Sequence, residues 1–274
     1  MTYTPSSVSR YFDRLAHGEW QRYDQSALGA IQFHVHDHYL RRFIAPGSRV
    51  LEIGAGPGRY TETLHQLGCR IVVGDISPVQ LSLNREYGQS RGFGVSVEAW
   101  LDLDICDLSA LPAASFDAVV AYGGPLSYVF ERREDALRSC RRILRPGGVL
   151  LASVMSLWGT IHRHLAALRD LPVDNMRRII DSGDLTPENE PASEHHCHMY
   201  RSDELVELLS RHGFSLRALS ASNTLSTNLE ALVQEIRQDR ARWAALLAFE
   251  VQAGAHPGYV DGGTHLVAVA QLPA

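Results

Sequence analysis

A strand-like apolar run that ends in alternating glycines constrains this chain more than any other feature. Residues 49–58 read RVLEIGAGPG, so that Gly54, Gly56 and Gly58 follow the apolar run directly. Glycines let the backbone approach a ligand closely, and the helix expected next offers free N–H groups at its start. Asp75 ends the next apolar run, RIVVGD, where a carboxylate can accept hydrogen bonds from both hydroxyls of a ribose. The arrangement predicts a site for a nucleoside-bearing cofactor.

Helical patterns and short apolar runs alternate through the centre of the chain, as they do in a mostly parallel sheet covered by helices. Ser77 and Pro78 form a strong helix start, a hydroxyl cap followed by a residue whose fixed φ suits the first turn. Helices are expected at 59–67, 78–88 and 133–144, and strands at 49–53, 70–75, 97–104, 116–122 and 149–155. The centre of the chain is therefore predicted to be α/β.

Composition and charge narrow the class of partner. Of the 274 residues, 45% are hydrophobic and 21% are charged, the net charge is −5, and no basic run occurs. The electrostatic footprint of a nucleic-acid binder is missing, so a small-molecule partner is expected. The first residues lack the apolar run of a signal peptide and no stretch is long enough to span a membrane, which predicts a cytoplasmic protein without a membrane partner. The four cysteines lie far apart, and we expect reduced thiols.

Four motifs in register give the chain a specific resemblance. They are the stretch from Glu52 to Gly58, Asp75, the run LDICDLSALPAASFDAVVAYGGPLSYV and the run RRILRPGGVLLASVMS. In this order they resemble the motifs of class I S-adenosylmethionine-dependent methyltransferases of the small-molecule type. The resemblance implies S-adenosyl-L-methionine as cofactor and S-adenosyl-L-homocysteine as product.

The same resemblance implies the fold and its divisions. The expected fold is a doubly wound, mostly parallel seven-stranded sheet with an antiparallel last strand, for which 264–272 is the candidate. A helical N-terminal lid is expected at 1–45. A Rossmann-like methyltransferase domain is expected at 46–274, with substrate-covering insertions at about 156–200 and 222–262.

The resemblance also implies cofactor contacts at the carboxyl ends of the strands. Asp75 would hold the ribose hydroxyls, Ile76 would pack on adenine, and the glycine turn would pass under the methionine part. Asp104 and Asp107 compete for the adenine amino group, and Asp104 is favoured because it ends the third expected strand, whereas Asp107 suits a turn or helix cap. The expected cofactor-binding residues are Glu52, Gly54, Ala55, Gly56, Asp75, Ile76, Asp104, Ile105, Tyr122 and Gly123.

A cluster of histidines, HHCHMY at 195–200, lies between the fifth expected strand and a helix begun by Ser202. Ligands of open α/β sheets bind beyond the carboxyl ends of the strands, and in related enzymes this stretch commonly lines the substrate pocket. If the stretch is extended, His196, His198 and Tyr200 share one face and point into the pocket together. We interpret them as substrate wall, with a metal site or structural packing as the alternatives.

An acceptor that must lose a proton would need a general base, for which His198, His196 and Tyr11 are the candidates. The lid aromatics Tyr11 and Tyr23 are expected to close over cofactor and acceptor, although both could simply pack the lid helix. The expected acceptor contacts are Tyr23, Leu126, Tyr128, His162, Tyr200 and His265.

The expected reaction is methyl transfer to an oxygen or nitrogen of a small organic acceptor in specialised metabolism. An NAD-dependent oxidoreductase is one alternative, but Arg59 stands where a dinucleotide fingerprint has its third glycine. A non-catalytic nucleoside-binding subunit is the other alternative. The amphipathic stretch within 222–262 fits either a substrate wall or the face of a homodimer.

Overall fold

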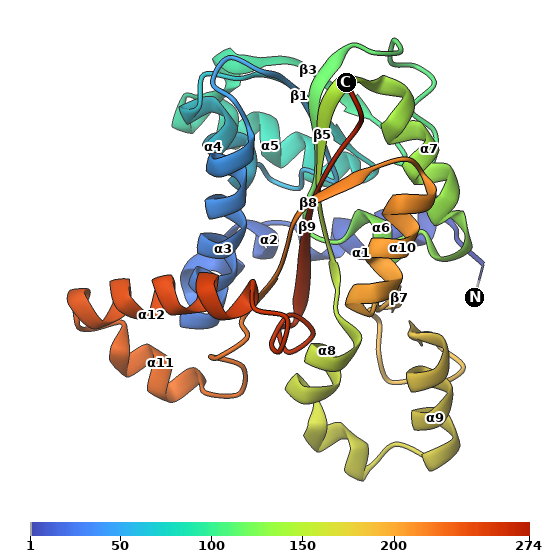
Figure 1. Ribbon diagram of the computed structural model, residues 1–274, viewed down its shortest axis with the longest axis vertical. Coiled ribbons are helices and arrows are strands. Elements are labelled where there is room, and N and C mark those ends of the chain that lie inside the picture. Colours follow the sequence, from blue (N-terminus) through green and yellow to red (C-terminus); the bar gives the residue numbers. More distant parts are fainter. Residues whose placement is uncertain (1) are drawn as a thin grey trace.

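The sheet at the centre of the fold has seven strands, as the computed structural model shows for the residues that it describes, 2–274 (Figure 1). Their order is β3-β2-β1-β4-β5-β9-β8; neighbours from β3 to β5 pair in parallel, and β9 pairs antiparallel to both β5 and β8. The strands are β1 (Arg49–Ile53), β2 (Arg70–Asp75), β3 (Val97–Asp102), β4 (Phe116–Ala121), β5 (Leu144–Met155), β8 (Ser215–Ser222) and β9 (His265–Gln271). The predicted doubly wound sheet with an antiparallel last strand is confirmed.

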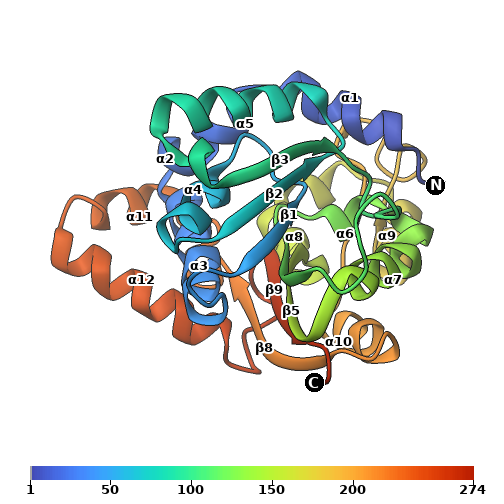
Figure 2. The same ribbon diagram turned by 90° about the horizontal axis from the view of Figure 1, so that it is seen from above.

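Helices cover both faces of the sheet, because successive side chains of each buried strand point to opposite faces. Leu51 and Ile53 of β1 pack in one core cluster with α7 and α10, whereas Val50 packs in the other with α3 and α4. Figure 2 shows these two pairs of helices on opposite sides of the sheet. The covering helices are α3 (Ala27–Phe43), α4 (Arg59–Gln66), α5 (Pro78–Arg91), α7 (Arg133–Ile143) and α10 (Ser202–Arg211). This packing leaves the carboxyl ends of the parallel strands as the edge where ligands bind.

Three element ends differ from the sequence-based expectation by two residues or more. β3 ends at Asp102, two residues earlier than expected, and β5 begins at Leu144, before the glycine pair that was expected to precede it. Helix α5 runs to Arg91 and stops where Gly92 takes φ of 86°. Gly88 does not stop this helix; it packs so closely on the following loop that a Cβ would meet an atom at 3.2 Å.

Two short helices, α1 (Pro5–Leu15) and α2 (Gly18–Gln25), come before α3 in the chain. The side-chain amide of Gln80 donates to the backbone oxygens of Phe12 and Ala16, and the Ser77 hydroxyl donates to Asp13. These bonds hold α1 on α5 near the end of β2. Helix α3 instead packs on the sheet, so only the first two helices of the predicted lid cover the strand ends.

The segment after β5 forms a separate cover. It consists of α8 (Leu157–Arg163), α9 (Val173–Ser182) and a hairpin of β6 (Asp184–Leu185) and β7 (Cys197–His198). Figure 1 shows α8 and α9 extending beyond the end of the sheet. The second insertion folds as α11 (Glu230–Ile236) and α12 (Arg240–Gly254), and α12 packs against α3 and β8. These two helices contribute no residue to the cavities described below, so they do not form the substrate wall that was one expectation for 222–262.

Apolar side chains fill the core between the sheet and the helices that cover it. The four cysteines, Cys69, Cys106, Cys140 and Cys197, are buried and free in the part of the chain that the structure describes. Among residues 2–274, no helix combines the length and the apolar character needed to cross a membrane.

Candidate functional site

The glycine turn between β1 and α4 has a backbone conformation that glycine adopts without strain. Gly54, Gly56 and Gly58 have φ of 68°, 55° and 104°, all in the left-handed region. A Cβ on Gly54 would stand 2.6 Å from Cγ of Pro125. Gly58 is the N-cap of α4, so bare backbone and the free N–H groups of a helix start lie together at this point.

Asp75 ends β2 and ties this turn to the next helix. Its carboxylate accepts hydrogen bonds from the amides of Gly56 and Ser77, both at 2.8 Å. Burial raises the pKa of Asp75 to about 6, against the opposing effect of these two bonds. Each carboxylate oxygen keeps a second lone pair, and Asp75 lines the cavity above the turn. It is therefore placed to accept hydrogen bonds from a ligand.

The first cavity lies over the glycine turn and reaches the lid helices. Nine of the ten predicted cofactor-binding residues line it: Gly54, Ala55, Gly56, Asp75, Ile76, Asp104, Ile105, Tyr122 and Gly123. Glu52 is the exception, because it is 2% exposed and accepts a hydrogen bond from the Thr61 hydroxyl at 2.6 Å. Burial raises its pKa to about 8. Glu52 supports the turn from inside the fold, so its predicted direct contact with a ligand is wrong.

The two competing aspartates have different surroundings. Asp104 lies just beyond β3, accepts a hydrogen bond from the amide of Cys106 at 2.8 Å, and lines the first cavity. Asp107 is exposed and accepts a hydrogen bond from the amide of Ser109 at 3.0 Å. Hydrogen bonds from Ser109 also lower the pKa of Asp107. The structure thus brings Asp104 to the cavity and gives Asp107 the turn-capping position.

Several residues of the first cavity were not predicted from the sequence. Phe12 of α1, Glu19 and Arg22 of α2 and Tyr60 of α4 all line it. Nε of Arg22 lies 3.2 Å from the Glu19 carboxylate, and the guanidinium stands 4.5 Å from the ring centre of Tyr23. The only sequence signal for this group is a charged pair within the aromatic-rich lid. Arg22 and Glu19 thus bring a paired positive and negative charge to the enclosed space next to the strand ends.

A second cavity adjoins the first beneath the cover. Five residues line both cavities: Phe12, Glu19, Arg22, Gly123 and Tyr128. The rest of the second cavity is lined by Tyr11, Leu15, Met155, Thr160, Arg163, His164, Leu185, His195, Cys197, Met199, Thr264 and His265. The space of each cavity, with its open mouth included, is about 790 Å³.

The histidine-rich segment faces this second cavity with the side opposite to the one expected. His195, Cys197 and Met199 line the second cavity. Tyr200 is fully buried in the core, where its hydroxyl donates to the carbonyl of Leu126 at 3.1 Å. The alternation of side chains is as predicted, but the assignment of the two faces was wrong. His196 lines a third, smaller cavity beside the lid.

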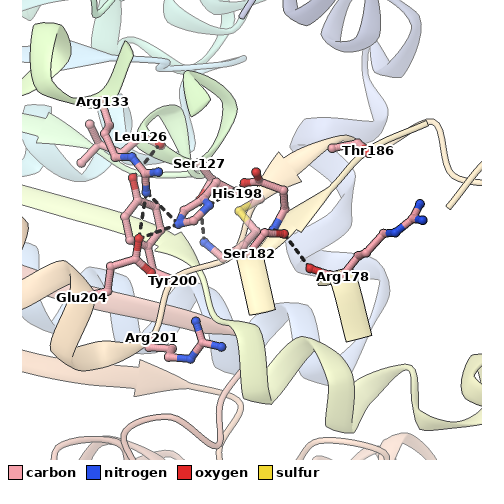
Figure 3. A network of polar contacts seen from close by, with 12 residues as sticks. Leu126, Ser127, Arg133, Arg178, Ser182, Thr186, His198, Tyr200, Arg201 and Glu204 are labelled. Atoms are coloured by element: carbon pink, nitrogen blue, oxygen red, sulfur yellow. Dashed lines mark hydrogen bonds and ion pairs between the residues drawn. The ribbon is translucent and has the colours of Figure 1, made fainter. Parts of the chain in front are cut away.

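His198 is held in a polar network instead of facing an acceptor (Figure 3). It is 2% exposed; Nδ1 lies 2.7 Å from the Asp184 carboxylate, and Nε2 lies 2.8 Å from that of Glu204. Arg133 contacts both Nε2 of His198 and Glu204 at 2.8 Å. Burial alone would lower the pKa of His198, but the bonds to the two carboxylates outweigh it and raise the pKa. The network fastens β7 to α7 and α10, so we assign His198 a structural position.

Of the remaining predicted acceptor contacts, three line a cavity, one lies in the core and one is exposed to solvent. Tyr128 and His265 line the second cavity, whereas Tyr23 lines the first and is 3% exposed. Leu126, in α6 (Pro125–Tyr128), is a core residue, and His162 on α8 is exposed. Neither lines any of the three cavities. The predictions for Leu126 and His162 are therefore corrected, because their helices direct these side chains into the core and into solvent.

Two of the three histidines that line the second cavity, His195 and His265, carry no charge at neutral pH. Burial, together with the charges of His196 and Arg22, lowers the pKa of His195 to about 4. Burial also lowers the pKa of His265 well below its ordinary value. Tyr11 stands beside His195 with ring centres 5.5 Å apart, and burial raises its pKa, so its phenol stays protonated. The cavity therefore offers neutral imidazoles next to protonated phenols.

The histidines do not converge into a ligand set for a metal. Among residues 2–274, no group of three or more His, Cys, Asp or Glu side chains is placed to hold a metal ion. His195 and His198 lie on opposite faces of the segment, and both ring nitrogens of His198 already have protein partners. One face of the segment lines the second cavity, and the other packs inside the fold.

Comparison with known proteins finds similarity in the core of the chain. Residues 51–152 match the family described as a methyltransferase domain. The ubiquinone biosynthesis O-methyltransferase of Xanthomonas campestris pv. campestris (strain B100) is 30% identical over 123 residues, which are 44% of this chain and 48% of that protein. The protein of the same name from Methylocella silvestris is 30% identical over 125 residues, which are 44% of this chain and 44% of that protein. The chain thus spans about half the length of the curated relatives it matches.

Solved structures share the fold over nearly the whole chain. An S-adenosylmethionine-dependent methyltransferase from Mesorhizobium loti has a TM-score of 0.59 at 19% identity, covering 91% of this chain and 99% of that one. A putative methyltransferase in complex with the Haloferax volcanii activator Trm112 has a TM-score of 0.62 at 19% identity, with 97% and 98% covered. A Burkholderia thailandensis 1,6-didemethyltoxoflavin-N1-methyltransferase, with that compound and S-adenosylhomocysteine bound, has a TM-score of 0.58 at 16% identity, with 98% and 88% covered.

Proposed function

We propose that this chain, whose core is a class I S-adenosylmethionine-dependent methyltransferase domain, transfers a methyl group from S-adenosylmethionine to a small organic acceptor. The observation that carries the proposal is the junction of the two cavities. The first cavity has the glycine turn and Asp75, and the second opens from it at Gly123 and Tyr128. A donor in one cavity and an acceptor in the other would meet at that junction.

The residues of the first cavity fit the cofactor by their own geometry. The glycine turn lines the cavity with bare backbone at Gly54 and Gly56, which would let the methionine part approach closely. Asp75 would accept from the ribose hydroxyls, since its oxygens line the cavity with lone pairs unused. Asp104 would accept from the adenine amino group, and Ile76 would pack on the ring. S-adenosylmethionine supplies an activated methyl group on sulfur.

The contribution of the chain to the reaction is alignment and exclusion of water. Bringing an acceptor atom behind the methyl group turns an encounter between two molecules into a reaction within one complex. The lid supplies Phe12 and the cover supplies Met199, both at the second cavity. Together they enclose the junction, and a water-poor site strengthens the electrostatic interactions within it.

We further propose an oxygen on a flat, weakly polar molecule as the methylated atom. The walls include the rings of Tyr11, Phe12 and Tyr128 and the side chains of Met155 and Met199. Such a slot favours a planar acceptor. The relatives named O-methyltransferases support oxygen over nitrogen. We also propose that this acceptor is a compound of specialised metabolism.

The proposed reaction is tested with S-adenosylmethionine that carries tritium in its methyl group, by following transfer of this labelled methyl group to an acceptor. The purified chain is incubated with catechol, with a hydroxybenzoate and with a primary aromatic amine, and labelled product and S-adenosylhomocysteine are measured together. For a hydroxylated acceptor we expect equal amounts of labelled product and S-adenosylhomocysteine, formed faster than in the absence of enzyme. If none of the acceptors yields labelled product while S-adenosylhomocysteine binds, the chain is a binding subunit and the proposed reaction is wrong.

A further inference from the structure

We propose that His195 takes the proton from the acceptor hydroxyl during methyl transfer, with Tyr128 holding the imidazole in place. The inference rests on the proposed function and deepens it, because it gives the acceptor class as a planar molecule that bears a hydroxyl group. It also moves the base from His196 and His198, which the sequence favoured, to a residue on the opposite face of the same segment.

The position of the His195 ring carries the proposal. Nε2 of His195 lies 2.8 Å from the hydroxyl of Tyr128, and the two ring centres are 5.5 Å apart at 69°. His195 lines the second cavity and Tyr128 lines both, so the pair stands at the junction where donor and acceptor would meet. Among residues 2–274, Nδ1 of His195 has no hydrogen-bond partner and is not sealed in the interior. It is therefore the nitrogen that an acceptor can reach.

The other histidines of the second cavity and Tyr11 are less suited to this role because of their contacts, exposure or protonation, and the Glu19 carboxylate, which lines both cavities, lies 3.2 Å from Nε of Arg22. The amide of Gln32 lies 3.3 Å from Nε2 of His265, and the Thr264 hydroxyl lies 3.1 Å from Nδ1, so that ring is occupied on both sides. His164 is exposed at the outer side of the cavity. Tyr11 keeps its proton because burial raises its pKa, which makes it a hydrogen-bond donor and not a base.

The proton transfer balances without any further reactant. The acceptor oxygen forms a bond to the methyl carbon while the carbon–sulfur bond breaks, and its electron pair stays on sulfur. The oxygen would be left positively charged, so its proton passes to Nδ1 of His195. Nε2 then carries the second proton of the imidazolium and donates it in a hydrogen bond to the Tyr128 oxygen. Release of the Nδ1 proton to water returns the ring to its neutral state.

The His195 imidazole is neutral in the free enzyme, as a group that accepts a proton must be. Burial and the positive charges nearby lower the pKa of His195 to about 4, so its ring is neutral and able to accept at neutral pH. A base this weak would not ionise a free phenol. It suffices here because the acidity of the oxygen rises steeply as the bond to methyl forms, which is when general-base transfer occurs.

The variant His195→Gln tests the assignment, because glutamine can still contact Tyr128 but cannot take a proton. With catechol as acceptor, we expect kcat to fall by about 10²- to 10⁴-fold, the range for a lost general base. The dissociation constant for S-adenosylhomocysteine should not change. Added imidazole should restore part of the activity of His195→Ala. His162→Gln, exposed on α8, is the matched control and should leave turnover unchanged.

Nitrogen-15 NMR of the complex with S-adenosylhomocysteine gives a second readout that needs no turnover. The His195 resonances are assigned by their loss in His195→Gln. We expect an unprotonated Nδ1 and a protonated Nε2 whose signal shifts in Tyr128→Phe. A protonated Nδ1 at neutral pH, or full catechol turnover by His195→Gln, would overturn the inference and leave the proposed function intact. A wild-type chain that methylates no hydroxylated acceptor would contradict the proposed function itself, and the NMR result still decides the state of His195.

Discussion

The carboxylate of Asp75 accepts a hydrogen bond from the backbone amide of Gly56 at 2.8 Å. The end of β2 and the turn after β1 are thereby fixed to each other before any ligand binds. Because the same carboxylate also holds the amide of Ser77, it sets the start of α5 as well. A preformed arrangement of this kind reduces the ordering that a ligand must impose on binding.

Replacement of Asp75 by alanine should weaken binding of S-adenosylhomocysteine. A carboxylate that accepts hydrogen bonds from ribose hydroxyls contributes about 1.5 to 3 kcal/mol, the range for bonds to a charged group. Calorimetric titration of both proteins measures the difference. An unchanged dissociation constant in a folded variant would show that Asp75 serves the turn alone.

Cofactor binding should also depend on pH through the same residue. The pKa of Asp75 in the empty site is about 6, and the ionised form is the better acceptor for ribose hydroxyls. Binding therefore favours loss of the proton, and affinity should fall as the pH drops below about 6, by at most tenfold per pH unit. The pH dependence of the dissociation constant should disappear in Asp75→Asn. A constant affinity across this range in the wild type would contradict the assignment.

The two aspartates after β3 should differ in their effect on the cofactor. Asp104 lines the first cavity, whereas Asp107 is exposed and caps a turn. Asp104→Ala should weaken binding of S-adenosylhomocysteine by less than Asp75→Ala does, and Asp107→Ala should have the smallest effect of the three. The ranking comes from parallel titrations. If Asp107→Ala proved the most damaging, the adenine contact would have been placed on the wrong residue.

His198 should matter for stability more than for chemistry. Replacing it by glutamine removes bonds to two carboxylates, and since those partners are about a third exposed, we expect a loss of about 2 kcal/mol in the free energy of unfolding. Because the pKa of His198 is raised in the folded state, its contribution to stability is fully present below about pH 6.5, the ordinary pKa of histidine. It is lost as the pH rises through the folded-state pKa, so the effect of the substitution should shrink in alkaline solution. Urea denaturation at two pH values measures it; turnover lost with stability intact would make His198 catalytic after all.

The cofactor half of the site could be predicted because its signals are local. The glycine turn needs left-handed backbone at Gly54 and Gly58, and Asp75 follows from its place at the end of an apolar strand. Each of these depends on a few neighbouring residues, which the sequence shows directly. Glu52 departed from expectation because its side chain, two positions before Gly54, points into the fold.

Tyr128 and His265 of the second cavity could be predicted, but the part from the histidine-rich segment could not, because tertiary contacts decide which face of a short strand meets the cavity. Both faces of HHCHMY carry histidine, so alternation gives no preference. Asp184 and Glu204 settle the choice by holding His198, and His195 is left at the cavity. Phe12 and Arg22 were missed for a similar reason, since the packing of α1 on α5 and of α2 on α3 brings them to the site.

Titration of the purified chain with S-adenosylhomocysteine and, separately, with NAD tests the central claim most directly. Isothermal calorimetry should show one site for S-adenosylhomocysteine with a dissociation constant in the micromolar range, about −8 kcal/mol, and no heat of binding with NAD. The site should weaken in Asp75→Ala and stay unchanged in His195→Gln. Binding of NAD without a response to S-adenosylhomocysteine would contradict the account.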